Sequence, residues 1–208
     1  MSTITAIRPD PRRPGRVRLE VDGQPYCTLA AGQAEAYGMR PGREVDEGLE
    51  PLLNEAADTD AALRALLRAL ERRSFARRDL ERRLQQRGHA PAAIVGAMAR
   101  ADELGLVDDA AYAQHFVATR AARGRGPARL IRDLMRSGVS RPLIDAAIAA
   151  QWPEGSDPDQ SVTGLVRRRA EQLRTLPKPV RRRRILAYLA RRGYSGHSVR
   201  QAVDQLIG

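Results

Sequence analysis

The chain has very little of several residue types that carry chemistry. Its 208 residues include one cysteine, three histidines and eight aromatic side chains. Cys27 alone can form neither an internal disulfide nor a thiolate metal cluster, so we expect a buried core thiol. His89, His115 and His197 are scattered along the sequence, which disfavours a metal or acid-base site. The sequence therefore predicts a protein that is not an enzyme and uses no cofactor.

Long apolar runs are also absent from the sequence. No stretch approaches the roughly 20 apolar residues that a bilayer span needs. Residues 1 to 5 lack the basic start and apolar stretch of a secretion signal. We therefore expect a cytoplasmic protein with no membrane partner. Hydrophobic residues make up 42% of the chain, and because few are aromatic, any core must consist of Leu, Ala, Ile and Val.

Positive charge is abundant and unevenly placed. The net charge is +11, and Lys178 is the only lysine among the 36 basic residues. Residues 1–57 have a net charge of −2, with 7 basic and 9 acidic side chains. The net charge is +3 over residues 58–104, zero over 105–164 and +10 over 165–208. Such a field attracts polyanions, of which nucleic acid is the commonest, whereas a merely solvated helix surface is the alternative.

One pattern of apolar residues around a glycine occurs three times. Two leucine-like residues precede the glycine by eight and four positions, and an apolar residue and an alanine follow it by six and nine. The copies are Leu80, Leu84, Gly88, Ile94 and Ala97; Leu130, Leu134, Gly138, Ile144 and Ala147; and Ile185, Leu189, Gly193, Val199 and Ala202. Repetition with a period of 50 to 55 residues indicates stacked copies of one supersecondary unit.

Each copy predicts three helices. In the first, Asp58, Thr59 and Asp60 are expected to cap an amphipathic helix, Ser74 to cap a second, and Pro91 to start a third after Gly88 ends the second. We place the repeats at residues 58–107, 108–152 and 161–208, with a polar linker over 153–160. The predicted fold is mainly α.

The first 57 residues predict a small β-rich N-terminal module. Residues 16–21 alternate charged and apolar side chains, Asp22-Gly23 is a hairpin turn, and residues 25–29 can return as the partner strand. Residues 3–7 are a candidate third strand, and residues 31–37 a short helix that ends at Gly38.

Two short motifs have structural explanations. Gly124-Arg125-Gly126-Pro127 lacks the lysine and spacing of a nucleotide-binding loop, so we interpret it as a helix start whose free amides are a candidate anion site. Asp108-Asp109 precedes a helix, where capping explains both carboxylates better than a metal pair does.

Clusters of arginine are the candidate binding residues. Four consecutive arginines span more than one helical turn, so residues 181–184 cannot all lie on one stripe. Aromatic side chains near these clusters are limited to Tyr188 and Tyr194, so stacking on bases is weakly supported. The candidates for contact with nucleic acid or a protein filament are Arg72, Arg73, Arg77, Arg78, Arg82, Arg83, Arg120, Arg125, Arg129, Arg167, Arg168, Arg169, Arg181, Arg182, Arg183, Arg184, Arg191 and Arg192.

The middle copy combines a capped helix start, an aromatic helix face and a Gly-Pro helix start. Its residues are Gly105, Leu106, Val107, Asp108, Asp109, Tyr112, Ala113, Phe116, Val117, Arg120, Gly126, Pro127, Leu130, Leu134 and Gly138. This segment resembles the signature of the RecX family of regulatory proteins. The resemblance covers residues 61–208. Residues 1–57 are similar to a short module of longer members, at Asp22-Gly23 and residues 37–42.

The resemblance implies three tandem three-helix repeats in an elongated, curved array. It also implies a regulator, in most cases an inhibitor, of the RecA recombinase, and we expect this regulator to be a monomer. Such a regulator lies in the groove or at the end of the RecA filament on single-stranded DNA and modulates ATP hydrolysis, strand exchange and SOS co-protease activity. DNA contacts would be weak and sequence-tolerant, on single and also on double strands.

Two other functions are compatible with the sequence. The chain can be an independent DNA-binding protein with tandem helix-turn-helix-like modules, which predicts tight, sequence-dependent binding. A nuclease or other enzyme is the poorest alternative, because carboxylates and histidines do not cluster in the sequence.

Overall fold

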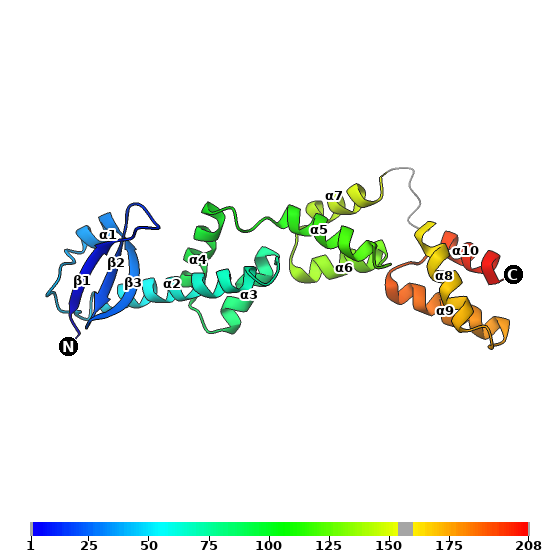
Figure 1. Ribbon diagram of the computed structural model, residues 1–208, viewed down its shortest axis with the longest axis horizontal. Coiled ribbons are helices and arrows are strands. Elements are labelled where there is room, and N and C mark those ends of the chain that lie inside the picture. Colours follow the sequence, from blue (N-terminus) through cyan, green and yellow to red (C-terminus); the bar gives the residue numbers. More distant parts are fainter. Residues whose placement is uncertain (1, 154–159, 208) are drawn as a thin grey trace. The chain divides into compact units, whose positions relative to one another are not determined.

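A computed structural model of the chain describes residues 2–153 and 160–207, and helices predominate among them (Figure 1). The described residues form ten helices and one three-stranded sheet, which confirms a mainly α fold with a β-rich N-terminal module. The chain divides into two compact units. The first contains Met1–Ser74 and Leu80–Val107, and the second contains Phe75–Asp79 and Asp108–Gly208.

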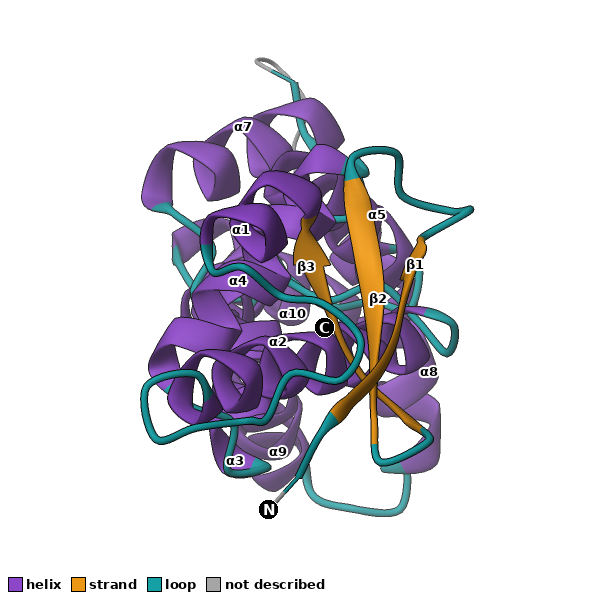
Figure 2. Ribbon diagram, turned by 90° about the vertical axis from the view of Figure 1, so that its left-hand side faces the viewer, coloured by secondary structure: helices purple, strands orange, loops and turns teal. Residues whose placement is uncertain are grey.

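The N-terminal module is an antiparallel sheet of consecutive strands, β1 (Ile4–Pro9), β2 (Arg16–Val21) and β3 (Gln24–Ala30) (Figure 2). Asp22 and Gly23 both have positive φ, 51° and 76°, as the predicted two-residue hairpin turn requires. Leu19 pairs with Cys27 in the register, and both are buried in a core that includes Leu49 and Leu53. The short helix α1 (Ala31–Ala36) follows β3.

Helix α2 (Glu50–Leu70) differs from the prediction, because it begins eight residues before Asp58. Its start is fixed by Asp46, whose Oδ1 accepts hydrogen bonds from the backbone N–H groups of Gly48 and Leu49 at 3.1 and 2.8 Å. Pro51 stands in the first turn, where its missing N–H costs nothing. The prediction that residues 58–60 cap this helix is therefore wrong: they lie inside a helix that packs its early leucines on the sheet.

The nine helices from α2 to α10 form three bundles of three. The first bundle contains α2, α3 (Arg77–Gln86) and α4 (Pro91–Glu103). The second contains α5 (Asp109–Ala121), α6 (Pro127–Ser137) and α7 (Arg141–Gln151). The third contains α8 (Gln160–Gln172), α9 (Lys178–Arg192) and α10 (His197–Ile207). Most of the predicted linker, residues 154–159, lies outside the described residues. No helix in the described ranges is long and apolar enough to cross a membrane.

The recurring positions form the bundle cores. The leucine-like pairs, such as Leu130 and Leu134, are 0 to 2% exposed in all three copies. The glycine after each pair ends the second helix of its bundle with a φ of +85° to +94°, a conformation that glycine adopts without strain. Ala202 alone among the repeated alanines is half-buried rather than buried.

Asp108 and Asp109 cap two different helices. Asp108 is the N-cap of α5, as predicted, and its Oδ1 accepts from the N–H groups of Ala110 and Ala111, both at 2.9 Å. Asp109 instead caps another helix, because its Oδ1 accepts from the N–H of Arg77 at 2.8 Å. Ser74 lies three residues before α3, so its predicted capping role is wrong.

Candidate nucleic-acid interface

The second and third bundles meet through a close backbone contact inside the second unit. The N–H of Gly126, the N-cap of α6, donates to the carbonyl oxygen of Arg192 at 2.8 Å. A Cβ on Gly126 would lie 2.5 Å from the oxygen of Gly193, and a Cβ on Gly193 would lie 2.4 Å from the backbone N of Arg129. Only glycine fits at these two positions. We call this contact the bundle joint.

The Arg192 side chain reinforces the bundle joint. Its Nη1 donates to the carbonyl oxygens of Arg123 and Gly124 at 2.9 and 3.1 Å, just beyond the end of α5. A guanidinium there satisfies carbonyl groups that the helix leaves unpaired and complements the helix dipole. Arg192 also lies 4.8 Å from the ring centroid of Tyr188, and Arg169 lies 5.3 Å from the same centroid.

The glycine-rich loop before α6 does not form the predicted anion site. The N–H of Gly124 donates to Ala121, that of Arg125 to Arg120, and that of Gly126 to Arg192. Since all three amides are engaged within the protein, the prediction that they bind an anion is wrong.

The candidate arginines of the second bundle are held by neighbours. Arg125 and Arg129 share the carboxylate of Asp133, at 2.9 and 3.1 Å, and the Asp133 side chain is only 12% exposed. Arg120 stacks on Phe116 at 3.7 Å from the ring centroid. Burial lowers the pKa of Arg120, and the charge of the nearby Arg125 lowers it further. These side chains hold the bundle as well as contribute charge.

The run of four arginines on α9 divides between two roles, as its length predicts. Arg182 forms a bidentate pair with Asp204 of α10, at 2.5 and 2.9 Å, and this hydrogen bonding raises the pKa of Arg182. Arg181 reaches the carbonyl oxygen of Ile207 at 3.4 Å. Arg183 and Arg184 are exposed. The first two arginines therefore attach α9 to α10, and the last two face solvent.

Uncompensated positive charge gathers on α8 and α9. These two helices carry ten basic side chains and one acidic one, Glu171, which pairs with Arg174 at 3.2 Å. On these two helices, the exposed arginines with no hydrogen bond or ion pair inside the described chain are Arg167, Arg168, Arg183, Arg184 and Arg191. The third bundle is thus the part of the protein best suited to bind a polyanion.

The candidate arginines do not all belong to one compact unit. Arg72, Arg73, Arg82 and Arg83 are exposed in the first unit, whereas the other fourteen belong to the second. Arg78 packs its side-chain carbons against Gly138, where a Cβ would lie 2.5 Å from the Cβ of Arg78. This arginine too has a packing role.

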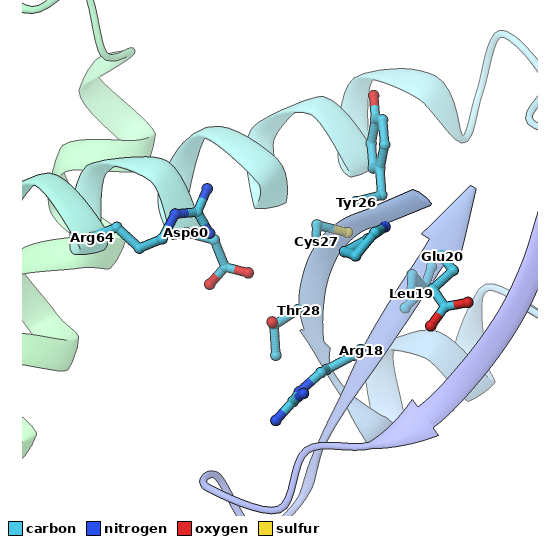
Figure 3. A pocket seen from close by; sticks show the side chains of 9 residues that line it. Arg18, Leu19, Glu20, Tyr26, Cys27, Thr28, Asp60 and Arg64 are labelled. Carbon is cyan, nitrogen blue, oxygen red and sulfur yellow. The ribbon is translucent and has the colours of Figure 1, made fainter. Parts of the chain in front are cut away.

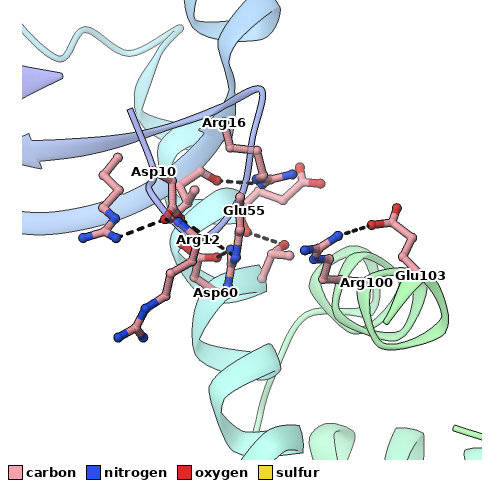
Figure 4. Close-up of polar contacts among 11 residues, drawn as sticks. Asp10, Arg12, Arg16, Glu55, Asp60, Arg100 and Glu103 are labelled. Atoms are coloured by element: carbon pink, nitrogen blue, oxygen red, sulfur yellow. Dashed lines mark hydrogen bonds and ion pairs between the residues drawn. The ribbon is translucent and has the colours of Figure 1, made fainter. Parts of the chain in front are cut away.

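A pocket of about 430 Å³ lies where β2 and β3 approach α2 (Figure 3). Charges of both signs line it, from Arg18, Glu20, Asp60 and Arg64. Cys27 also lines it, but burial raises the pKa of this thiol to about 12, so it is no nucleophile at neutral pH. The nearby polar groups serve the fold: Arg18 pairs with Asp10 and Arg13 with the buried Asp60, both at 3.0 Å (Figure 4).

The structure gives the histidines no shared site. His89 Nδ1 lies 2.5 Å from Oδ1 of Asp58, whose Oδ2 also accepts from the N–H of Ala90 at 2.8 Å. This carboxylate therefore ties α2 to the start of α4. Among the described residues, no group of three or more His, Cys, Asp or Glu side chains is arranged to hold a metal ion.

The first unit is expected to lose stability in acid. Burial raises the pKa of Asp58, but hydrogen bonds from His89 and Ala90 outweigh it and lower the pKa overall. The backbone N–H of Arg12, followed by Arg18, likewise lowers the pKa of Asp10. A carboxylate with a lowered pKa stabilises the fold above its unfolded pKa of about 3.9, and this contribution is lost as pH falls through the folded value. The free energy of unfolding should therefore decrease as the pH is lowered below about 4.

Asp58→Asn should flatten this pH profile, measured by urea unfolding. Glu35→Gln, which removes an exposed carboxylate, is the matched control. An equal flattening by the control would mean that the Asp58 contacts are not the source.

Two participants in the site, Tyr188 and Arg123, have roles that the sequence did not predict. Tyr188 was considered only for stacking on bases, yet two guanidinium groups contact its ring. The i, i+4 spacing of Tyr188 and Arg192 is a signal for that contact. Arg123 was not among the candidates, and its carbonyl contact with Arg192 has no signature in the sequence.

Comparisons with known proteins agree on one family. Residues 108–148 match the model for the RecX second three-helix domain, and residues 157–203 match that for the third. A regulatory protein RecX from Chlorobium phaeobacteroides is 32% identical over 159 residues, which cover 73% of this chain and 98% of that protein. One from Thermobifida fusca is 37% identical over 160 residues, covering 74% and 85%.

Solved structures share the fold. The crystal structure of a regulatory protein RecX superposes with a TM-score of 0.71 at 21% identity, over 99% of this chain and all of that one. RecX from Lactobacillus salivarius gives a TM-score of 0.60 at 17% identity, over 72% of this chain and 96% of that one.

Proposed function

Because the chain belongs to the RecX family of non-enzymatic regulatory proteins, we propose that it regulates a RecA recombinase. In this proposal it binds in the groove or at the end of the RecA filament on single-stranded DNA. There it inhibits ATP hydrolysis, strand exchange and the SOS co-protease activity. It acts in the cytoplasm as a monomer.

The observation that carries the proposal is the uncompensated charge of the third bundle. Ten basic side chains on α8 and α9 against one acidic side chain give this bundle a strong attraction to a phosphate backbone. Bundles that differ so much in charge are suited to different contacts on a composite partner of protein and DNA. We propose that the N-terminal module (1–57) and the three repeats (58–107, 108–152 and 161–208) divide such contacts between them.

The eighteen candidate arginines are the proposed contact set, with unequal contributions. Those held by carboxylates or carbonyl groups, such as Arg125, Arg182 and Arg192, give charge from fixed positions. Those with no partner in the described chain, such as Arg183 and Arg184, are free to bind phosphate directly. DNA alone should therefore be bound weakly, with a steep salt dependence and little sequence preference.

The test is ATP hydrolysis by a recombinase filament assembled on single-stranded DNA. Added protein should lower the hydrolysis rate at or below one molecule per recombinase subunit. An unchanged rate at stoichiometric protein would contradict the proposal.

Binding to DNA alone, measured by fluorescence anisotropy, distinguishes the competing function. Tight binding to one sequence, with no effect on the recombinase, would favour an independent DNA-binding protein with tandem helix-turn-helix-like modules.

A further inference from the structure

Three exposed arginines lie around the stacked Tyr188. Arg184 precedes Tyr188 by four positions on α9 and Arg191 follows it by three, so all three side chains lie on one face of the helix. The backbone of Arg123 lies beside them, since its carbonyl oxygen accepts a hydrogen bond from the Arg192 guanidinium that contacts the Tyr188 ring. We call Arg123, Arg169, Arg184, Arg191 and Arg192, together with Tyr188, the basic seam.

The basic seam carries positive charge that no acidic side chain of residues 2–153 and 160–207 neutralises. Arg123, Arg184 and Arg191 are exposed, and no hydrogen bond or ion pair of the described chain engages their side chains. The acidic side chains of the third bundle are committed elsewhere, because Glu171 pairs with Arg174 and Asp204 with Arg182. The three free guanidinium groups are available for an anionic ligand.

The lack of exposed large apolar side chains around the seam, in the part of the chain that the structure describes, argues against a protein partner there. Among the described residues, the large apolar side chains that are exposed are Tyr26, Tyr37, Val95, Leu104, Leu106 and Met135, and none belongs to α8, α9 or α10. Protein interfaces are anchored by buried apolar and aromatic side chains, whereas phosphate backbones are bound by charge and hydrogen bonds. The seam offers charge and hydrogen-bond donors, as a phosphate-binding surface does.

The ring of Tyr188 contacts two of the cations of the seam. Arg169 and Arg192 both contact it, and Arg192 is also fixed by two carbonyl groups of the second bundle. Two cations are thus held close together, and no ion pair with a described carboxylate engages either of them. Arg184 and Arg191 lie seven residues apart, about 10 Å along the helix, which matches the rise of about three nucleotides in one strand of a duplex.

We propose that the basic seam binds the phosphodiester backbone of nucleic acid, with Arg123, Arg184 and Arg191 contacting phosphates. Tyr188 is a positioning residue that holds Arg169 and Arg192 beside them. The inference deepens the proposed function, on which it rests for the role of the bound nucleic acid, and it assigns the contact to a surface that both the second and third bundles supply.

A charge-matched pair of double variants tests the proposal. Arg184→Gln/Arg191→Gln removes two seam charges, and Lys178→Gln/Arg200→Gln removes two exposed charges from the same bundle, at residues outside both the seam and the eighteen candidate arginines. Affinity for a labelled single-stranded oligonucleotide and for a duplex of equal length is measured over a range of salt. The seam variant should bind either form about tenfold more weakly, with a salt slope smaller by about 1.4 for the single strand. The control should lose less than threefold.

Equal losses in the two variants would overturn the proposal, because binding would then follow net charge alone. Loss for only one of the two nucleic-acid forms would support the seam and identify the form that it binds.

Tyr188 variants test the positioning role without changing charge. Tyr188→Leu should weaken DNA binding severalfold, whereas Tyr188→Phe, which keeps the ring, should bind as the unmodified protein does. Unchanged DNA affinity in Tyr188→Leu, even with a lower melting temperature, would show that the ring is only structural and would contradict the assignment.

Failure of this inference is distinguishable from failure of the proposed function. A seam variant that loses DNA affinity but still slows recombinase ATP hydrolysis supports the seam and places the regulatory contact on protein. A protein that binds DNA through the seam but leaves hydrolysis unchanged supports the seam and contradicts the regulatory function. A protein without measurable affinity for either oligonucleotide overturns the seam.

Discussion

Replacing Gly193 with alanine should lower the free energy of unfolding of the second unit by about 3 kcal/mol. The positive φ of this residue, +94°, costs an alanine about 1 kcal/mol. Its Cβ would also lie 2.4 Å from the backbone N of Arg129 and 2.5 Å from the Arg129 Cβ, so backbone must move. Overpacking of this kind adds about 1 to 3 kcal/mol. Urea unfolding, followed by circular dichroism, measures the change.

Gly88→Ala is the matched control for Gly193→Ala. Gly88 ends the second helix of the first bundle with nearly the same φ, +85°, but a Cβ there meets no described atom within 4 Å. We therefore expect a loss of only about 1 kcal/mol, from the backbone conformation alone. Equal losses at the two glycines would show that the bundle joint adds nothing to stability. Faster proteolysis between the second and third bundles, in Gly193→Ala only, would locate the damage at the joint.

Replacing Arg192 with alanine should cost about 2 kcal/mol, the second largest effect that we expect. The substitution removes two hydrogen bonds from a charged donor to the carbonyl groups of Arg123 and Gly124, together with the contact on Tyr188. Hydrogen bonds from charged groups contribute about 1.5 to 3 kcal/mol each when buried, and partial exposure reduces that figure here. Thermal and urea unfolding measure the loss.

Replacing the neighbouring Arg191 should affect DNA binding and not stability. Arg191 is exposed and has no partner in the described chain, so Arg191→Ala should leave the free energy of unfolding nearly unchanged. The same substitution should weaken DNA binding, through loss of one phosphate contact. If Arg191→Ala destabilises the protein as much as Arg192→Ala does, the division between structural and binding arginines is wrong.

The bundle cores could be predicted because the same buried positions recur in each three-helix copy. Leu130, Leu134 and Gly138 recur at fixed spacing since two apolar turns and a left-handed glycine are needed to close a three-helix core. Local chemistry also predicted the hairpin at Asp22-Gly23 and the cap at Asp108. These features depend on residues close in sequence.

Features that depend on distant residues could not be predicted. Helix α2 begins at Glu50 because its early leucines pack on the sheet that precedes it in the chain. The capping residue types at 58–60 predicted a later start, since they carry no information about that packing. Asp109 caps α3 from 32 residues away. The family resemblance predicted the fold and the class of function. It could not predict that Arg192 stabilises the bundle joint while the adjacent Arg191 is exposed, because this difference depends on contacts with the second bundle.

The three repeated glycines, alike in the sequence, should differ in which residues can replace them. Gly138 and Gly193 each approach the first turn of a second helix, at Arg78 and Arg129, whereas Gly88 approaches no described residue. Asparagine tolerates the left-handed conformation, so position 88 can accept it, while positions 138 and 193 have no room for any side chain. We therefore expect position 88 to vary more among related sequences than positions 138 and 193 do.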